Sequence, residues 1–142
     1  MSDTSNYPLT GRCQCGAIEY SVAEPFALQV VCHCTECQKY TAAAFGITVM
    51  INSEAFTITK GQLRKWTRSA DSGNTNDCYF CAGCGNRIYH QNPDKPRIIK
   101  LKPGTLDDVS VIAPEMHVWV KSKQPWVQIP QGIKQYDTQP EF

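Results

Sequence analysis

Cysteine is the residue type in this chain that points most directly to chemistry. The sequence holds eight cysteines, which fall into three short groups: Cys13-x-Cys15, Cys32-x-Cys34-x-x-Cys37 and Cys78-x-x-Cys81-x-x-Cys84. Cysteines two or three residues apart are poorly placed to form a disulfide with each other, whereas two thiolates at this spacing suit one metal ion. The spacing therefore predicts metal sites.

Two of the groups can complete one closed zinc site. Structural zinc is commonly held by two short cysteine pairs that folding brings together. Cys81-x-x-Cys84 is followed by Gly85, which allows a tight turn beside a metal. We predict a structural zinc held by the four-sulfur cluster, which is Cys13, Cys15, Cys81 and Cys84. The alternative is that Cys13 and Cys15 are small buried side chains.

The remaining compact group is the three-sulfur cluster, which is Cys32, Cys34 and Cys37. Three protein ligands plus an exchangeable fourth position is the pattern of catalytic zinc. Three thiolates give Zn²⁺ a net charge of about −1, so it would activate water modestly but would accept a fourth thiolate well. We predict that a small thiol occupies this position. The alternative is a second structural zinc, closed by a remote fourth ligand.

Two side chains lie between the predicted ligands of the three-sulfur cluster. His33 either makes a hydrogen bond behind the metal or points into solvent, and the sequence leaves both open. Glu36 could act as a base, but a glutamate in a loop is usually solvated. We therefore place neither residue among the catalytic groups.

Cys78 is the odd thiol. In an extended strand it points to the face opposite Cys81, because side chains alternate, and we expect a buried, inert thiol. It could instead supply the fourth ligand of the three-sulfur cluster. An iron–sulfur interpretation is weak, because Ile88 stands where the fourth cysteine of a ferredoxin-type run would fall.

Short strands must position these groups. Alternating or β-branched runs predict strands over residues 17–22, 45–51, 55–59, 63–67, 77–81, 87–90, 97–101 and 116–120, and a short helical turn over 35–41. Many short strands with frequent turns predict a mainly β fold, with mostly antiparallel sheets. We expect an exposed, mobile loop over 70–76.

Length and composition limit the organisation and the partners. We expect a flexible N-terminal tail over residues 1–10, one zinc-binding β domain over 11–130 and a C-terminal tail over 131–142. The net charge of +1 argues against a nucleic-acid partner. No apolar run approaches the roughly 20 residues that span a bilayer, and residues 1–10 lack the features of a signal peptide. A cytoplasmic protein with reduced thiols is the default expectation.

Several motifs together resemble a known family. They are Gly11-Arg12-Cys13-Gln14-Cys15-Gly16, Cys32-His33-Cys34-x-x-Cys37-Gln38-Lys39, Phe80-Cys81-x-x-Cys84-Gly85, Gly104-Thr105-Leu106-Asp107-Asp108, Pro114-x-x-His117 and Pro125-Trp126. With these motifs the chain resembles the glutathione-dependent formaldehyde-activating enzyme family, which also contains proteins related to centromere protein V. The resemblance runs from about Gly11 to Trp126.

The resemblance implies a fold of packed antiparallel sheets of the β-tent type, stapled by zinc. It also implies two Zn²⁺ ions per chain, with the four-sulfur cluster structural and the three-sulfur cluster catalytic. The family activity is the condensation of formaldehyde with glutathione to S-hydroxymethylglutathione, formally a carbon–sulfur lyase run in reverse.

Taken together, these features predict a zinc-dependent carbon–sulfur lyase that acts on adducts between a glutathione-like thiol and a small aldehyde such as formaldehyde. The alternatives are a non-catalytic zinc-binding interaction module and a glutathione carrier without turnover. Lys39, Arg64, Lys65 and Arg68 could contact the carboxylates of glutathione, but exposed basic residues are usually just solvated.

Overall fold

The computed structural model describes residues 7–69 and 73–140. Its strands are β1 (Leu9–Arg12), β2 (Glu19–Val22), β3 (Leu28–Cys32), β4 (Gly46–Asn52), β5 (Phe56–Lys60), β6 (Leu63–Ser69), β7 (Thr75–Cys81), β8 (Arg87–Gln91), β9 (Ile98–Leu101), β10 (Met116–Val118) and β11 (Lys134–Gln135). Its helical elements are α1 (Thr35–Thr41) and the 3₁₀ turns η1 (Ser53–Ala55), η2 (Pro103–Thr105), η3 (Val109–Val111) and η4 (Val120–Ser122). The predicted mainly β class and the short helix over 35–41 are confirmed.

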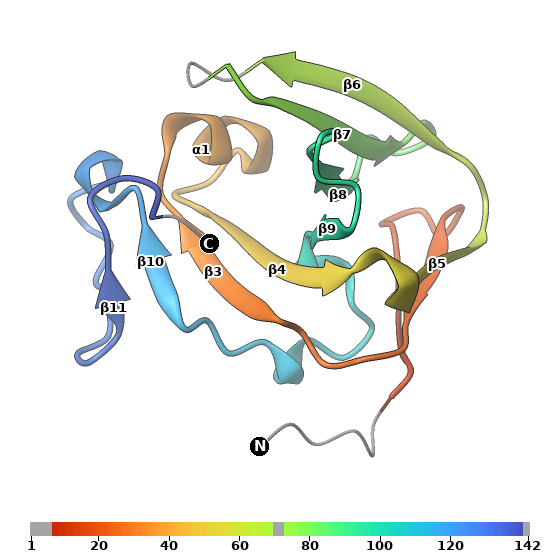
Figure 1. The fold of residues 1–142 in the computed structure, drawn as a ribbon, viewed down its shortest axis with the longest axis horizontal. Helices are drawn as coiled ribbons and strands as arrows, with labels where there is room; N and C mark the ends of the chain where they lie inside the picture. Colours follow the sequence, from red (N-terminus) through yellow and green to blue (C-terminus); the bar gives the residue numbers. More distant parts are fainter. Residues whose placement is uncertain (1–6, 70–72, 141–142) are drawn as a thin grey trace.

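The strands form two sheets. The smaller sheet has the order β1-β2-β5, and the larger has the order β11-β10-β3-β4-β9-β8-β7-β6. Pairing is antiparallel except at β10, which runs parallel to both β3 and β11, so the larger sheet is mixed. Figure 1 shows β10 and β11 at one end of the molecule and the N-terminal strands at the other, with β3 and β4 between them.

The main core lies where the two sheets meet. Tyr20 and Val22 of the smaller sheet are in one buried cluster with Val49, Ile51 and Leu101 of the larger sheet. These side chains are at most 2% exposed, and each contributes about 1.5–3 kcal/mol on burial. The core therefore joins the two sheets into one body.

The other face of β4 is turned toward α1. Gly46 and Thr48 alternate with the core residues Val49 and Ile51 along this strand. A Cβ atom added to Gly46 would lie 2.6 Å from Tyr40 Oη and 3.3 Å from Cys37 Cβ. Helix α1 therefore packs closely on this face, and only a residue without a side chain fits beneath it.

A β-bulge changes the direction of side chains on β8. Tyr79 pairs with Tyr89, but the next residue of β7, Phe80, pairs with Arg87, so Ile88 is the extra residue. Ile88 is fully buried in the main core together with the partly buried Tyr89. The bulge consequently puts Arg87 and His90 on one face of the sheet, the face that points away from the main core. In a regular strand, residues three apart would point to opposite faces.

The structure changes several predicted boundaries. Strand β1 begins at Leu9 and pairs with β2, so the last two residues of the tail expected over 1–10 belong to a strand. The tail expected over 131–142 contains β11, which pairs with β10. Residues 1–6 lie outside the described residues. The strand predicted over 17–22 is restricted to β2 because Ile18 N donates to Cys13 Sγ and belongs to the turn at that sulfur. Of the loop predicted over 70–76, residues 75 and 76 belong to β7, and 70–72 lie outside the described residues.

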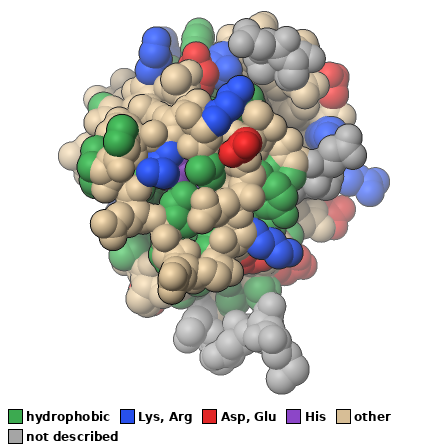
Figure 2. Space-filling model, turned by 90° about the vertical axis from the view of Figure 1, so that its left-hand side faces the viewer, with side chains coloured by type: hydrophobic (Ala, Val, Ile, Leu, Met, Phe, Trp, Pro, Cys, Tyr) green, Lys and Arg blue, Asp and Glu red, His purple; other side chains and the backbone are tan. Residues whose placement is uncertain are grey.

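Two observations describe the surface. Among residues 7–69 and 73–140, no helix has the length and apolar character needed to cross a bilayer. On the face drawn in Figure 2, basic and acidic side chains lie scattered among hydrophobic and uncharged ones, and they form no continuous basic stripe there.

Candidate functional site

The structure brings the four-sulfur cluster together. The sulfur atoms of Cys13, Cys15, Cys81 and Cys84 all lie within 4.8 Å of one another. The separation is 3.6 Å from Cys13 Sγ to Cys15 Sγ and 3.7 Å from Cys15 Sγ to Cys81 Sγ. Tetrahedral zinc with Zn–S bonds of about 2.3 Å requires sulfurs about 3.8 Å apart. The cluster therefore fits Zn²⁺.

Two glycine-containing turns hold these sulfurs. The first turn joins β1 to β2 and includes Gly16 at φ 80°, and the second joins β7 to β8 and includes Gly85 at φ 77°. Both φ values lie in the left-handed region that favours glycine. In the second turn Gly83 N donates to Cys81 Sγ over 3.3 Å, as Ile18 N does to Cys13 Sγ in the first. Backbone amides aimed at sulfur stabilise the thiolate form.

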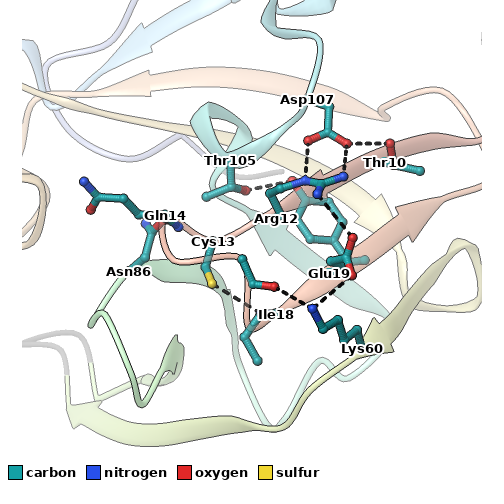
Figure 3. A network of polar contacts seen from close by, with 12 residues as sticks. Thr10, Arg12, Cys13, Gln14, Ile18, Glu19, Lys60, Asn86, Thr105 and Asp107 are labelled. Atoms are coloured by element: carbon teal, nitrogen blue, oxygen red, sulfur yellow. Dashed lines mark hydrogen bonds and ion pairs between the residues drawn. The ribbon is translucent and has the colours of Figure 1, made fainter.

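Polar contacts join the surroundings of the two turns. Gln14 N donates to Asn86 Oδ1 over 2.9 Å, and this bond links the two halves of the four-sulfur cluster directly (Figure 3). Beside it, Arg12 Nε bonds to Asp107 Oδ1 at 3.0 Å, and Arg12 Nη1 lies 3.4 Å from Glu19 Oε1. These ion pairs are largely exposed and contribute little each. The hydrogen bond between the halves, by contrast, helps to set the distance between the two pairs of sulfurs.

The three-sulfur cluster is built where β3 runs into α1. Cys32 ends β3, Cys34 is the N-cap of α1 and Cys37 lies in its first turn. Their sulfur atoms lie within 4.8 Å of one another, and Cys37 N donates to Cys34 Sγ over 3.3 Å. In the described part of the chain, no fourth Cys, His, Asp or Glu joins this group.

The three thiols of this cluster share their protons unevenly. Hydrogen bonds from the thiols of Cys32 and Cys37 lower the pKa of Cys34 to about 2. Hydrogen bonding with Cys34 raises the pKa of Cys32 to about 11, and bonds to Cys32 and Cys34 raise the pKa of Cys37. The hydrogen bonds therefore favour a thiolate at Cys34 that is in contact with the thiols of Cys32 and Cys37. A divalent cation at the centre would allow all three to ionise together, because its charge offsets their repulsion.

Comparison with known proteins assigns the family. A family model described as glutathione-dependent formaldehyde-activating enzyme matches residues 8–122. The chain belongs to this family. A curated relative from Halomonas elongata, named "Putative glutathione-dependent formaldehyde-activating enzyme", is 27% identical over 127 residues, which cover 85% of this chain and 80% of the relative. A crystal structure of a Rhodobacter sphaeroides protein has a similar fold, with a TM-score of 0.56 at 22% identity over 70% of this chain and 88% of that chain.

His33, in the family's cysteine motif, is fully buried. Its Nε2 lies 2.8 Å from His117 Nδ1, and its ring makes a T-shaped contact with the Phe45 ring, with centroids 5.6 Å apart. Solvent exposure, one of the two predicted alternatives, is therefore wrong for His33. Burial, followed by the field of His117, lowers the pKa of His33 to about 4, so the ring is neutral.

Gln38 fixes the loop of the three-sulfur cluster from behind. Its Nε2 donates to His33 O at 2.8 Å and to Ser122 O at 2.9 Å, and its Oε1 accepts from Gln124 Nε2 at 3.1 Å. Neither Gln38 nor His117 was predicted from the sequence as a positioning residue. The available signal was their presence in the family motifs, beside the cysteines and after Pro114.

The structure also shows where Cys78 and Glu36 lie. Cys78 is 1% exposed, and its Sγ donates to Asn76 O at 3.8 Å. It is not among the three sulfurs that lie within 4.8 Å of one another, so the structure does not bring it into the cluster as a fourth ligand. Glu36 lies in the first turn of α1 with its side chain exposed.

One basic residue, Lys102, lies directly after β9 and near the three-sulfur cluster. Lys102 is 9% exposed, and its Nζ donates to Thr48 Oγ1 over 2.8 Å and lies 5.1 Å from the centroid of the Tyr40 ring. Burial lowers the pKa of Lys102 to about 8, while the charges of Cys37 and Cys32 act to raise it. The environment of the cluster is therefore positively charged as well as rich in sulfur.

Proposed function

We propose that this protein is a zinc-dependent carbon–sulfur lyase that acts on adducts between a small aldehyde, such as formaldehyde, and a glutathione-like thiol. The three-sulfur cluster carries this proposal, because three converging ligands without a fourth from the described chain leave room for a substrate sulfur. Membership of the formaldehyde-activating family supports the substrate class. We place the activity in the cytoplasm, where such thiols stay reduced.

The reaction in the synthetic direction forms one carbon–sulfur bond. The thiol sulfur attacks the carbonyl carbon, the carbonyl π electrons move to oxygen, and the thiol proton ends on that oxygen, so nothing is oxidised or reduced. Zinc, when bound by the three-sulfur cluster, would hold the substrate sulfur as a thiolate. The chain itself orients that sulfur through the fixed loop of Gln38 and His33, and orientation lowers the barrier to attack.

Zinc analysis together with rate measurement tests this proposal. The purified protein should contain about two zinc ions per chain, and Cys34→Ser should lose one while keeping its circular dichroism spectrum. The wild-type protein should accelerate the exchange of label between formaldehyde and its glutathione adduct, measured by NMR above the spontaneous rate. Cys34→Ser should return that exchange to the spontaneous rate.

The alternatives give different results. A glutathione carrier would change zinc-edge X-ray absorption when glutathione is added but would leave the exchange rate unchanged. A non-catalytic zinc module would show four sulfurs around both ions before any thiol is added. Either result contradicts the proposed activity.

A further inference from the structure

The ammonium group of Lys102 is buried, and no carboxylate of the described residues pairs with it. Lys102 reaches Thr48 Oγ1, and Thr48 lies on the same side of β4 as Gly46, the side on which α1 packs. The Lys102 ammonium is therefore on the side of the sheet that holds the three-sulfur cluster. No ion pair of Lys102 occurs within residues 7–69 and 73–140. A buried cation normally has an anionic partner, because its desolvation is costly.

The guanidinium group of Arg87 is held in position by uncharged groups. Arg87 Nη1 donates to His90 Nε2 over 2.8 Å, and the bulge at Ile88 makes this bond geometrically possible. The Arg87 Cζ atom lies 5.4 Å from the Tyr40 ring centroid and 5.7 Å from that of Trp66. Across the described residues Arg87 forms no ion pair with a carboxylate. An ordered guanidinium with free N–H donors is pre-organised for a bidentate anion.

Tyr40 connects these two cations to the sulfurs. It follows Cys37 by one helical turn, so both side chains lie on one side of α1. Its ring is within 5.4 Å of both Arg87 Cζ and Lys102 Nζ. Tyr40 Oη and Cys37 Cβ both lie close to Gly46, at 2.6 Å and 3.3 Å from the place of an added Cβ, so the Tyr40 hydroxyl is beside a residue of the cluster.

The charges on this face do not balance. Three thiolates with Zn²⁺ carry a net charge of about −1, whereas Arg87, Lys102 and the neighbouring Lys100 carry three positive charges. Lys100 Nζ bonds to the uncharged Asn76 Oδ1 at 3.3 Å. The nearby carboxylate of Asp77 is adjacent in β7 to Cys78 and therefore on the other face. There it accepts from Thr67 Oγ1 at 2.7 Å and lies 3.9 Å from Lys65 Nζ.

We propose that Arg87 and Lys102 form a carboxylate-binding subsite for the thiol substrate whose sulfur reaches the three-sulfur cluster. This inference rests on the proposed function and assigns residues to one part of its substrate, the carboxylate that a glutathione-like thiol carries. Arg87 supplies the directed pair of N–H donors, and Lys102 supplies a desolvated positive charge. Tyr40, Trp66 and His90 are positioning residues for the guanidinium.

Binding of S-methylglutathione tests the subsite apart from sulfur chemistry, because the methyl group prevents formation of a thiolate. Calorimetry should detect binding to the zinc-loaded wild-type protein, and Arg87→Gln should weaken it by about tenfold or more. Lys65→Gln is the matched control, since Lys65 is on the other face and pairs with Asp77. Its affinity should be that of the wild type. No wild-type binding, or equal binding by Arg87→Gln, overturns the proposal.

A pair of thiols tests the same subsite during turnover. With formaldehyde, the ratio of kcat/KM for glutathione to that for the uncharged 2-mercaptoethanol should fall by about tenfold or more in Arg87→Gln. Arg87→Lys should recover part of it, which excludes misfolding as the cause. An unchanged ratio with normal turnover overturns the subsite and leaves the lyase proposal standing. Turnover absent from the wild type, combined with Arg87-dependent binding of S-methylglutathione, overturns the lyase and supports the subsite.

Discussion

The ionisation of the three thiols near α1 is uneven, and this has a chemical consequence. Only Cys34 has a lowered pKa, whereas the pKa values of Cys32 and Cys37 are raised by the hydrogen bonds among the three sulfurs. A metal ion that binds all three as thiolates must therefore displace protons from two of them at neutral pH.

Zinc affinity at the three-sulfur cluster should consequently depend steeply on pH. Because the raised pKa values keep Cys32 and Cys37 protonated near neutrality, each rise of one pH unit should lower the apparent Kd by about two orders of magnitude. Competition with a calibrated chelator between about pH 6 and 8 would measure this dependence. An apparent Kd that does not change with pH would contradict the release of two protons on zinc binding.

His117 should stabilise the loop through His33. Since His33 Nδ1 has no hydrogen-bond partner among the residues that the structure describes, His117→Ala would leave both ring nitrogens of a buried histidine unpaired there. The expected loss is about 1–3 kcal/mol in the free energy of unfolding, measured by urea denaturation of the zinc-loaded protein. His117→Asn keeps a polar group near the same place and should lose less. Equal stabilities of the alanine variant and the wild type would show that the bond is dispensable.

At the scale of elements, the contact between α1 and β4 sets the position of Cys37. The helix has no fully buried residue of its own, and its position depends on the close approach at Gly46. The bulge in β8 acts similarly on the opposite side, because it turns Arg87 and His90 toward the helix. A glycine in β4 and a bulge in β8 thus shape the surroundings of the sulfurs.

Gly46→Ala should disturb this contact. The added methyl group would meet the Tyr40 hydroxyl and Cys37 Cβ, so we expect a loss of about 1–3 kcal/mol in the free energy of unfolding and weaker zinc retention at the three-sulfur cluster. Gly104→Ala is the control, because a Cβ at Gly104 meets nothing within 4 Å and should change stability by less than about 0.5 kcal/mol. Urea unfolding and zinc content after dialysis would measure both effects, and matching results for the two variants would refute the steric argument.

At the scale of the whole molecule, the four-sulfur cluster joins distant parts of the chain. Cys15 and Cys81 are 66 residues apart in sequence, and their sulfurs lie 3.7 Å apart. A metal at this cluster ties the turn of the smaller sheet to a hairpin of the larger one. It restricts the unfolded chain in the way that a long-range cross-link does.

Removal of this staple should therefore affect the fold more than removal of the other metal. We expect Cys84→Ser to lower the free energy of unfolding by about 4 kcal/mol, from the closure of a loop of this length, while Cys34→Ser changes it far less. Thermal unfolding with parallel zinc analysis would compare the two variants. The reverse order of stabilities would show that the three-sulfur cluster is the structural one.

Cysteine spacing was enough to predict which sulfurs form the two clusters, and the alternating and β-branched runs were enough to predict the mainly β class. The environment of the three-sulfur cluster was not predictable in this way. His117 reaches His33 through a parallel pairing of β10 with β3, across 84 residues of sequence. The face on which Arg87 lies depends on the bulge at Ile88 in β8. The alternation of side chains expected for a regular strand does not predict such a bulge. Of the basic residues considered from sequence, Lys65 is bound to Asp77 on the other face.

The parallel pairing of β10 with β3 also has a consequence for biosynthesis. The ribosome makes the cysteines of the three-sulfur cluster early, but Lys102, His117 and Ser122, which surround them, follow some 65 to 90 residues later. A nascent chain can thus expose three reactive thiols before the residues that surround them have been translated. Metal capture during synthesis, rather than after release, would protect those thiols from oxidation during this interval.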